Sequence, residues 1–152
     1  MLGLMQNYPL LVQTILDHAA LNHGEREMVT RSIEGPIRRY TYRDMRTRAL
    51  RVAKALQKEG VVLGDRIATM AWNTDRHVEV WYGIMGLGAI SHTVNPRLFA
   101  EQLIYIMNHA EDKILFVDLT FVPLIEALAA KLPTIKKYII LTDEAHMPET
   151  SL

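Results

Sequence analysis

The feature that most constrains the fold of this chain is a regular alternation of short apolar runs and longer amphipathic segments between residues 66 and 142. The apolar runs at 66–71, 89–94, 113–118 and 137–142 have the length and composition of strands. Strands that are separated by helices require parallel crossover connections. The sequence therefore predicts an α/β fold, a mostly parallel sheet with crossover helices.

Local signals mark where the crossover helices begin and end. Asn73 or Thr74 is expected to cap a helix that runs to about Leu87 and ends at Gly88, and Thr120 is expected to cap the last one. The apolar faces expected to cover the sheet are Phe99, Leu103, Ile106, Met107 and Ala110 in the middle helix, and Phe121, Ile125, Leu128, Ala129 and Leu132 in the last.

The first 60 residues predict two helices and a β-hairpin. A helix is expected from Pro9 to Gly24, a hairpin from 27–32 and 37–41 around a turn at 34–36, and a helix that Thr41 caps and Gly60 ends. The apolar faces of these helices are Leu11, Val12, Ile15, Leu16 and Ala19, and Met45, Ala49, Val52, Ala53 and Leu56.

Charge and composition narrow the class of protein. The 152 residues contain 17 Lys/Arg and 17 Asp/Glu, but residues 1–60 have a net charge of +4 and residues 61–152 of −4. A neutral total disfavours a dedicated nucleic-acid binder, and no nucleic-acid partner is expected. The absence of cysteine fits a reducing, cytoplasmic setting. No secretory signal or transmembrane segment is predicted.

The motifs of common catalytic sites do not occur in this sequence. There is no G-x-G-x-x-G after a strand and no glycine-rich phosphate loop, so a nucleotide site within these residues is not expected. The six histidines lack metal-ligand spacing, and the three serines lie outside any G-x-S-x-G elbow. No catalytic, cofactor-binding or metal-binding residue is assigned from the sequence.

Three residues could still contact a ligand. His77 lies in the first turn of its helix, where it could form a functional hydrogen bond or be a core-edge histidine satisfied by the backbone. Asn95 and Arg97 follow a strand at the sheet edge that binds ligands in open α/β folds. The Asn-Pro-Arg sequence can also be an ordinary turn that orients the next helix. We favour this turn over a ligand contact, because Asn and Pro are common turn residues.

Six basic side chains gather on the helix that follows Thr41. Because neither interleaved aromatics nor a recognition-helix context accompanies them, we interpret them as a solvated face rather than a nucleic-acid site. Leu50 is the exception, an apolar side chain on the charged side. The basic residues are Arg43, Arg46, Arg48, Arg51, Lys54 and Lys58.

Two glycines share one face of the 75–87 helix. Gly83 and Gly86 lie with Glu79 opposite a face formed by His77, Trp81 and Ile84. Because glycine inside a helix costs about 1 kcal/mol relative to alanine, two on one face indicate a close approach by another element. We therefore expect this helix to be covered on both sides.

Several residue clusters resemble one protein family when they are taken together. The sequence has Ala-Trp-Asn at 71–73, Arg-His at 76–77, His-Thr-Val-Asn-Pro-Arg-Leu at 92–98 and Asn-His-Ala-Glu-Asp-Lys at 108–113. With Met-Leu-Gly at 1–3 and Thr-Asp-Glu at 142–144, these resemble the N-terminal stretch of medium- and long-chain fatty-acyl-CoA ligases, which are adenylate-forming, AMP-binding enzymes.

The resemblance implies an ATP-dependent, two-step ligation in lipid metabolism. A fatty acid is adenylated with release of pyrophosphate, and the acyl group then passes to coenzyme A, with Mg²⁺ assisting. Residues 1–152 would be the N-terminal part of the large AMP-binding domain, without the family's phosphate loop and C-terminal domain. The chain alone is therefore expected to be an inactive fragment.

An alternative from another class is a free-standing α/β interaction module. Leu50 and the glycine face would then form a homodimer or partner contact, which the missing remainder of a ligase could equally cover. The sequence does not determine acyl-chain length preference or oligomeric state.

Overall fold

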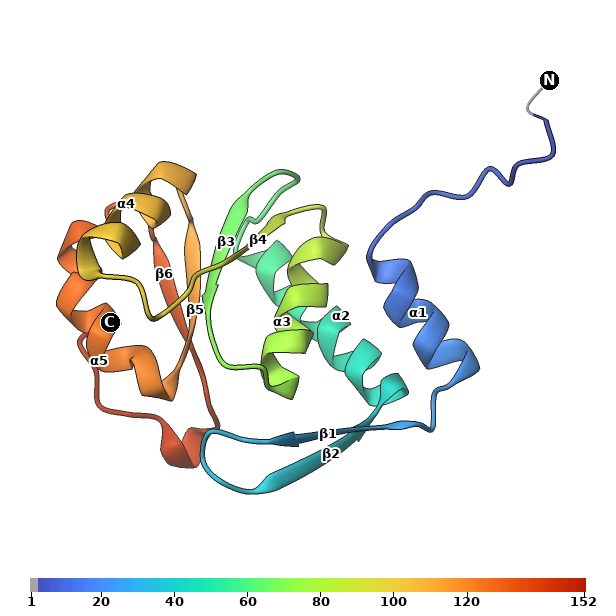
Figure 1. The fold of residues 1–152 in the computed structure, drawn as a ribbon, viewed down its shortest axis with the longest axis horizontal. Coiled ribbons are helices and arrows are strands. Elements are labelled where there is room, and N and C mark those ends of the chain that lie inside the picture. The colour runs from blue at the N-terminus through green and yellow to red at the C-terminus, as the bar shows by residue number, and fades with distance from the viewer. Residues whose placement is uncertain (1–2) are drawn as a thin grey trace.

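The computed structural model describes residues 3–152, which form a four-stranded parallel sheet, a separate hairpin and covering helices (Figure 1). The strands of the larger sheet are β3 (Arg66–Met70), β4 (Ile90–Thr93), β5 (Ile114–Asp118) and β6 (Lys137–Leu141), in the order β4-β3-β5-β6. Each neighbouring pair is parallel, with Ala68 opposite both His92 and Leu115. The predicted α/β class and parallel sheet are confirmed.

Helices cover both faces of this sheet. α2 (Tyr42–Lys58) and α3 (Asp75–Gly86) lie on one face, and α4 (Ala100–Ala110) and α5 (Val122–Leu128) on the other (Figure 1). Successive residues of β5 alternate between the two cores, and all five are buried. A strand buried on both faces is continuously apolar, which is why the 113–118 run shows no polar alternation.

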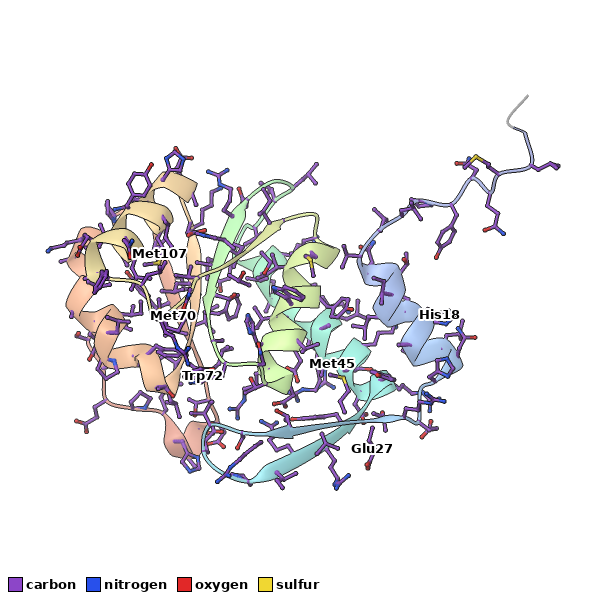
Figure 2. All side chains as sticks on the ribbon, in the orientation of Figure 1. His18, Glu27, Met45, Met70, Trp72 and Met107 are labelled. Atoms are coloured by element: carbon purple, nitrogen blue, oxygen red, sulfur yellow. The ribbon has the colours of Figure 1, made fainter. Side chains whose placement is uncertain are left out.

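The N-terminal elements form a third packed region. β1 (Glu27–Arg31) and β2 (Ile37–Thr41) make the antiparallel hairpin, and α1 (Gln13–Asn22) packs against α2. Their core is a small cluster around Met45, which Figure 2 places apart from Met70 and Met107 of the α4 side. Thr41 and Asp44 form the predicted capping box, with the Asp44 N–H donating to Thr41 Oγ1 at 3.1 Å.

Three local predictions are wrong. α1 begins at Gln13 rather than Pro9, and Leu11, Val12 and Ile15 are exposed, so only part of the expected face is covered. The 3₁₀ turn Leu119–Phe121 precedes α5, and no side chain caps that helix. Phe99 is exposed because it precedes α4, whose buried face is Leu103 and Met107.

The order of pairing creates a switch point between β3 and β5. From β3 the chain moves outward to β4, and then returns to the other side of β3 to form β5. In open α/β sheets, ligands bind outside the carboxyl ends of the strands at such a point. This edge is therefore the first place to examine for function.

Candidate functional site

Asp118 ends β5 at the switch point, where it holds the loop that follows β3. Its Oδ2 accepts a hydrogen bond from the Trp72 N–H at 2.6 Å, while its Oδ1 is buried without a partner. Burial raises the pKa of Asp118 to about 6, because one N–H donor does not compensate for the loss of water. One oxygen of the carboxylate therefore positions the main chain of the loop after β3, and the other has no partner in the described residues.

The Trp72 indole lies beside the same point, near the end of β5 and the start of α5 (Figure 2). Its ring packs against Phe121 at a centroid distance of 5.2 Å, and its Nε1–H donates to Thr120 Oγ1 at 3.3 Å. Thr120, expected to cap a helix, instead accepts from this indole. These contacts join the loops that follow β3 and β5.

A buried ion pair joins the hairpin turn to β6 at this edge. Arg76 Nη1 lies 2.6 Å from Glu34 Oε1, which also accepts from Thr142 Oγ1 at 2.8 Å. Burial alone would raise the pKa of Glu34, but a backbone hydrogen bond and those from Thr142 and Arg76 lower it to about 2. The pair therefore remains ionised across the physiological range and holds the hairpin against the sheet.

His77 lies beside a cavity of about 270 Å³ between β1 and the start of α3. Its Nε2 is 3.0 Å from Thr69 Oγ1, and Met28, Val78 and Trp81 supply apolar lining. Burial lowers the pKa of His77, partly offset by a hydrogen bond with the Trp72 backbone. A neutral imidazole bonded within the fold favours the structural interpretation of His77.

Asn95 and Arg97 form a turn after β4. Asn95 Oδ1 accepts the Arg97 N–H at 3.0 Å, and the Asn95 carbonyl accepts the Leu98 N–H. Both side chains are exposed. This is the turn interpretation that the sequence favoured, and it directs the chain into α4.

Three of the six basic side chains of α2 are matched by acids. Arg43 pairs with Glu25 and Arg46 with Asp17, each at 2.5 Å, and both arginines lie at the surface. Arg48 pairs with the buried Glu79 of α3, a hydrogen bond that raises the pKa of Arg48. The solvated-face interpretation holds for Arg43 and Arg46, whereas Arg48 links two helices.

The glycine hypothesis holds at only one of its two positions. A Cβ on Gly83 would lie 2.6 Å from Val52 Cγ1, so α2 and α3 approach closely there. A Cβ on Gly86 would meet nothing within 4 Å. The helix is covered at Gly83 and open at Gly86, where Leu50 lines the same small groove.

A hydrogen-bonded histidine–aspartate pair, of the kind that catalytic triads contain, lies away from the carboxyl edge of the sheet. His92 Nδ1 is 2.7 Å from Oδ2 of the fully buried Asp112, and that hydrogen bond raises the pKa of His92. No serine or threonine hydroxyl in residues 3–152 is hydrogen-bonded to His92. Sequence reasoning missed this pair, because 20 residues separate its members and no motif spacing marks them.

The described residues do not fit Mg²⁺ and ATP by themselves. Within residues 3–152, no three His, Asp or Glu side chains gather into a metal site, and no glycine-rich loop follows a strand. At the carboxyl edge, Asp118 Oδ2 accepts from main chain and Glu34 from Arg76, whereas Asp118 Oδ1 and both oxygens of Asp75 are buried without a hydrogen-bond partner in the described residues. Every helix in the described part is too short or too polar to cross a bilayer.

Comparison with known proteins shows which family model and which proteins this chain is similar to. Residues 16–152 match the family model described as AMP-binding enzyme. The chain is 44% identical over 147 residues to 3-methylmercaptopropionyl-CoA ligase of Ruegeria pomeroyi, covering 95% of this chain and 27% of that protein. It is 43% identical over 141 residues to medium-chain-fatty-acid–CoA ligase of Ectopseudomonas oleovorans, covering 93% and 26%.

Solved structures give the same fold. The chain matches an anthranilate CoA ligase in complex with anthranoyl-AMP with a TM-score of 0.77 and 26% identity, over 90% of this chain and 27% of that one. A fatty acyl CoA synthetase from Mycobacterium tuberculosis matches with a TM-score of 0.74 and 25% identity, over 86% and 26%. The chain thus spans about a quarter of the length of the curated relatives it matches.

Proposed function

This chain belongs to the AMP-binding enzyme family, and from that premise we propose that it is part of an ATP-dependent acyl-CoA ligase. The whole protein would join a carboxylic acid to coenzyme A through an acyl-adenylate. The observation that carries this proposal is the family match over residues 16–152, together with curated relatives that are themselves named CoA ligases.

The role of these residues would be to build the sheet behind the reaction centre. Asp118, Arg76 and Glu34 hold the loops at the carboxyl edge through contacts within the chain, which supports a scaffold rather than a reacting group. When bound, ATP supplies the adenylate that activates the acid, and Mg²⁺ offsets phosphate charge. The residues that bind ATP and Mg²⁺ would lie in other parts of the whole protein. We also propose a cytoplasmic location.

The proposed substrate is a fatty acid or a short carboxylic acid with an unbranched apolar chain. The relatives' names include 3-methylmercaptopropionyl, medium-chain and long-chain acyl groups, at 44%, 43% and 38% identity to this chain.

Pyrophosphate release tests the proposal directly. Residues 1–152 alone, supplied with ATP, Mg²⁺, coenzyme A and either octanoate, palmitate or 3-methylmercaptopropionate, should give no turnover above a no-enzyme blank. A longer reading frame that contains these residues and an in-frame phosphate loop should release pyrophosphate and form acyl-CoA. Turnover by residues 1–152 alone would contradict the scaffold role, and a longer frame without ligase activity would contradict the proposed reaction.

A second candidate is an interaction module, which one observation favours. Leu50 is half-exposed and lines a groove of about 110 Å³ with Tyr82 and Gly86, between α1, α2 and α3. A contact there would produce a defined dimer. Light scattering that shows a single dimeric species, lost in Leu50→Glu, would support the module over the ligase fragment.

A further inference from the structure

Among residues 3–152, β1 pairs with β2 on one side only, and its other edge faces the start of α3 (Figure 1). Beyond one end of the ladder, the Ser32 N–H donates to the Pro36 carbonyl at 3.0 Å. Beyond the other end, the Tyr42 N–H donates to the Arg26 carbonyl at 3.1 Å. Bonded and unbonded pairs alternate in an antiparallel ladder, so the even-numbered residues of β1 bond to β2. Val29 therefore directs its N–H and its C=O away from β2.

The cavity of about 270 Å³ beside His77 lies at this free edge. Met28, Val29 and Thr30 line it from β1, and the first two turns of α3 with the loop before them line it from the other side. Within residues 3–152, no main-chain hydrogen bond from outside the hairpin reaches the Val29 N–H or C=O. The fold thus leaves a main-chain donor and a main-chain acceptor free beside a cavity.

Asp75 adds a third polar group to the wall of the same cavity. Its side chain is buried, yet neither carboxylate oxygen has a hydrogen-bond partner in the described residues. Arg38 Nη2 lies 3.6 Å from Asp75 Oδ2, an ion pair too long to be a hydrogen bond. A buried acceptor without a donor costs free energy, so a ligand that supplies an N–H there gains binding. Because Arg38 already balances the charge of Asp75, a neutral ligand fits better than a cation.

Much of the remaining cavity wall is apolar. Met28, Val78 and Trp81 line it, and the Trp81 side chain is 44% exposed, so it can be reached from solvent. The His77 Nε2 is already engaged by Thr69 Oγ1. A cavity of about 150 Å³ holds a benzene molecule, so this larger one accommodates a single ring with a short polar substituent.

We propose that the cavity between the free edge of β1 and the start of α3 binds a small, neutral primary carboxamide that carries an apolar ring. The carboxamide oxygen accepts the Val29 N–H, and one of the two amide N–H groups donates to the Val29 C=O. The second amide N–H donates to Asp75, and the ring lies against Val78 and Trp81. This site goes beyond the proposed ligase reaction, since it needs neither ATP nor coenzyme A.

The shape of the cavity favours a compact molecule over an extended peptide. A further strand would also pair with Glu27 and Arg31, the outward-facing residues two positions to either side of Val29. Neither residue lines the cavity, whose wall on β1 is limited to residues 28–30. A ligand that pairs with Val29 alone matches this short wall.

An NMR titration of residues 1–152 with benzamide tests the site without any ligase activity. The Val29 amide proton should move downfield and saturate with a Kd of about 1 mM or tighter. The Trp81 indole signal should shift along the same curve. The amides of Met28 and Thr30, which pair with β2, serve as the internal reference and should shift less. N,N-dimethylbenzamide, which has no N–H, and benzoate, which has a charge and no donor, should bind at least about tenfold more weakly.

A pair of proline variants tests the main-chain contact, with the Trp81 signal as the readout. Val29→Pro removes the outward N–H of an edge strand, where proline is tolerated. It should weaken benzamide binding by about tenfold or more. Arg31→Pro removes the equivalent N–H outside the cavity and should bind benzamide like the parent chain.

A pair of asparagine variants tests the carboxylate contact. Asp75→Asn replaces a charged acceptor by a neutral one and should weaken benzamide binding by about fivefold. Asp65→Asn changes another buried carboxylate, which is 2.7 Å from Lys113 and precedes β3 at the opposite edge of the sheet. This control should leave the affinity for benzamide unchanged.

Four outcomes would overturn the inference. Benzamide could fail to saturate the Val29 and Trp81 shifts by about 10 mM. N,N-dimethylbenzamide could bind as tightly as benzamide, which would leave apolar contact alone. Arg31→Pro could weaken binding as much as Val29→Pro. A six-residue peptide of alternating threonine and valine could shift the Glu27, Val29 and Arg31 amides together at concentrations where benzamide has no effect, which would assign the edge to a peptide strand.

Discussion

Two buried carboxylates at the carboxyl edge respond to burial in opposite ways. Glu34 and Asp118 are both nearly inaccessible to solvent. Glu34 receives hydrogen bonds from Arg76 and Thr142, which outweigh the effect of burial and lower its pKa to about 2. Asp118 receives one main-chain N–H, and burial raises its pKa to about 6. The number of donors, and not depth in the fold, decides the charge state.

Asp118→Asn should therefore change stability in a pH-dependent way. The folded chain holds this proton up to about pH 6, whereas the unfolded chain releases it near pH 4. The contribution of Asp118 to stability thus falls as pH rises between these values and is constant above. Urea unfolding should show the variant gaining about 2 kcal/mol relative to the parent from pH 4 to pH 7. The exposed control Glu101→Gln should change the free energy of unfolding by less than about 0.5 kcal/mol at pH 7.

Glu34→Gln should show the opposite dependence. The lowered pKa means that Glu34 stabilises the fold above about pH 4.5 and loses this contribution as pH falls toward 2. Removing its charge leaves the buried Arg76 with only its longer ion pair to Asp143, at 4.0 Å, and should cost up to about 3–5 kcal/mol near pH 7. Urea unfolding should show this cost shrinking by pH 3.5. Glu27→Gln, which breaks an exposed ion pair with Arg39 on the same hairpin, should cost less than about 1 kcal/mol.

At the scale of elements, α3 organises the packing. Its first turn carries Arg76 and His77 to the carboxyl edge, and Glu79 pairs with Arg48 of α2. Gly83 lets the two helices approach, since a side chain there would meet Val52. The sequence indicated a close approach from the two glycines, but it did not distinguish Gly83, which contacts α2, from Gly86, which faces open space.

Gly83→Ala and Gly86→Ala form a matched pair that measures this difference. At Gly83 the new Cβ would lie 2.6 Å from a branched side chain that cannot move freely, and overpacking of this kind costs about 1–3 kcal/mol. At Gly86 the space is open, so alanine should stabilise the helix by up to about 1 kcal/mol. Thermal unfolding should show a lowered Tm for the first variant and a raised Tm for the second. Equal shifts would contradict the assigned contact.

At the scale of the whole molecule, the two oppositely charged segments of the chain contact each other. Arg38 and Arg48, from residues 1–60, lie against Asp75 and Glu79 of α3. Two further ion pairs between the segments run the other way, Arg76 with Glu34 and Lys137 with Glu59. Half of the basic side chains on α2, namely Arg43, Arg46 and Arg48, are matched within the fold.

Heparin chromatography should reflect that matching. Arg51, Lys54 and Lys58 are the α2 basic residues for which no ion pair occurs in residues 3–152, too few for a strong polyanion site. The chain should elute near the starting salt, and replacement of all three by glutamine should leave its elution unchanged. Retention that falls steeply with added salt would favour the nucleic-acid interpretation instead.

The sequence by itself determined the elements and their class. Strand positions, the α2 capping box and the parallel α/β arrangement follow from local periodicity and helix-end signals, which act over a few residues. Only the tertiary structure decided the order β4-β3-β5-β6 and the pairing of Glu34 with Arg76 and of Asp118 with Trp72. These contacts join residues 42 and 46 positions apart, and their geometry depends on how helices and sheet pack together, which no local spacing encodes.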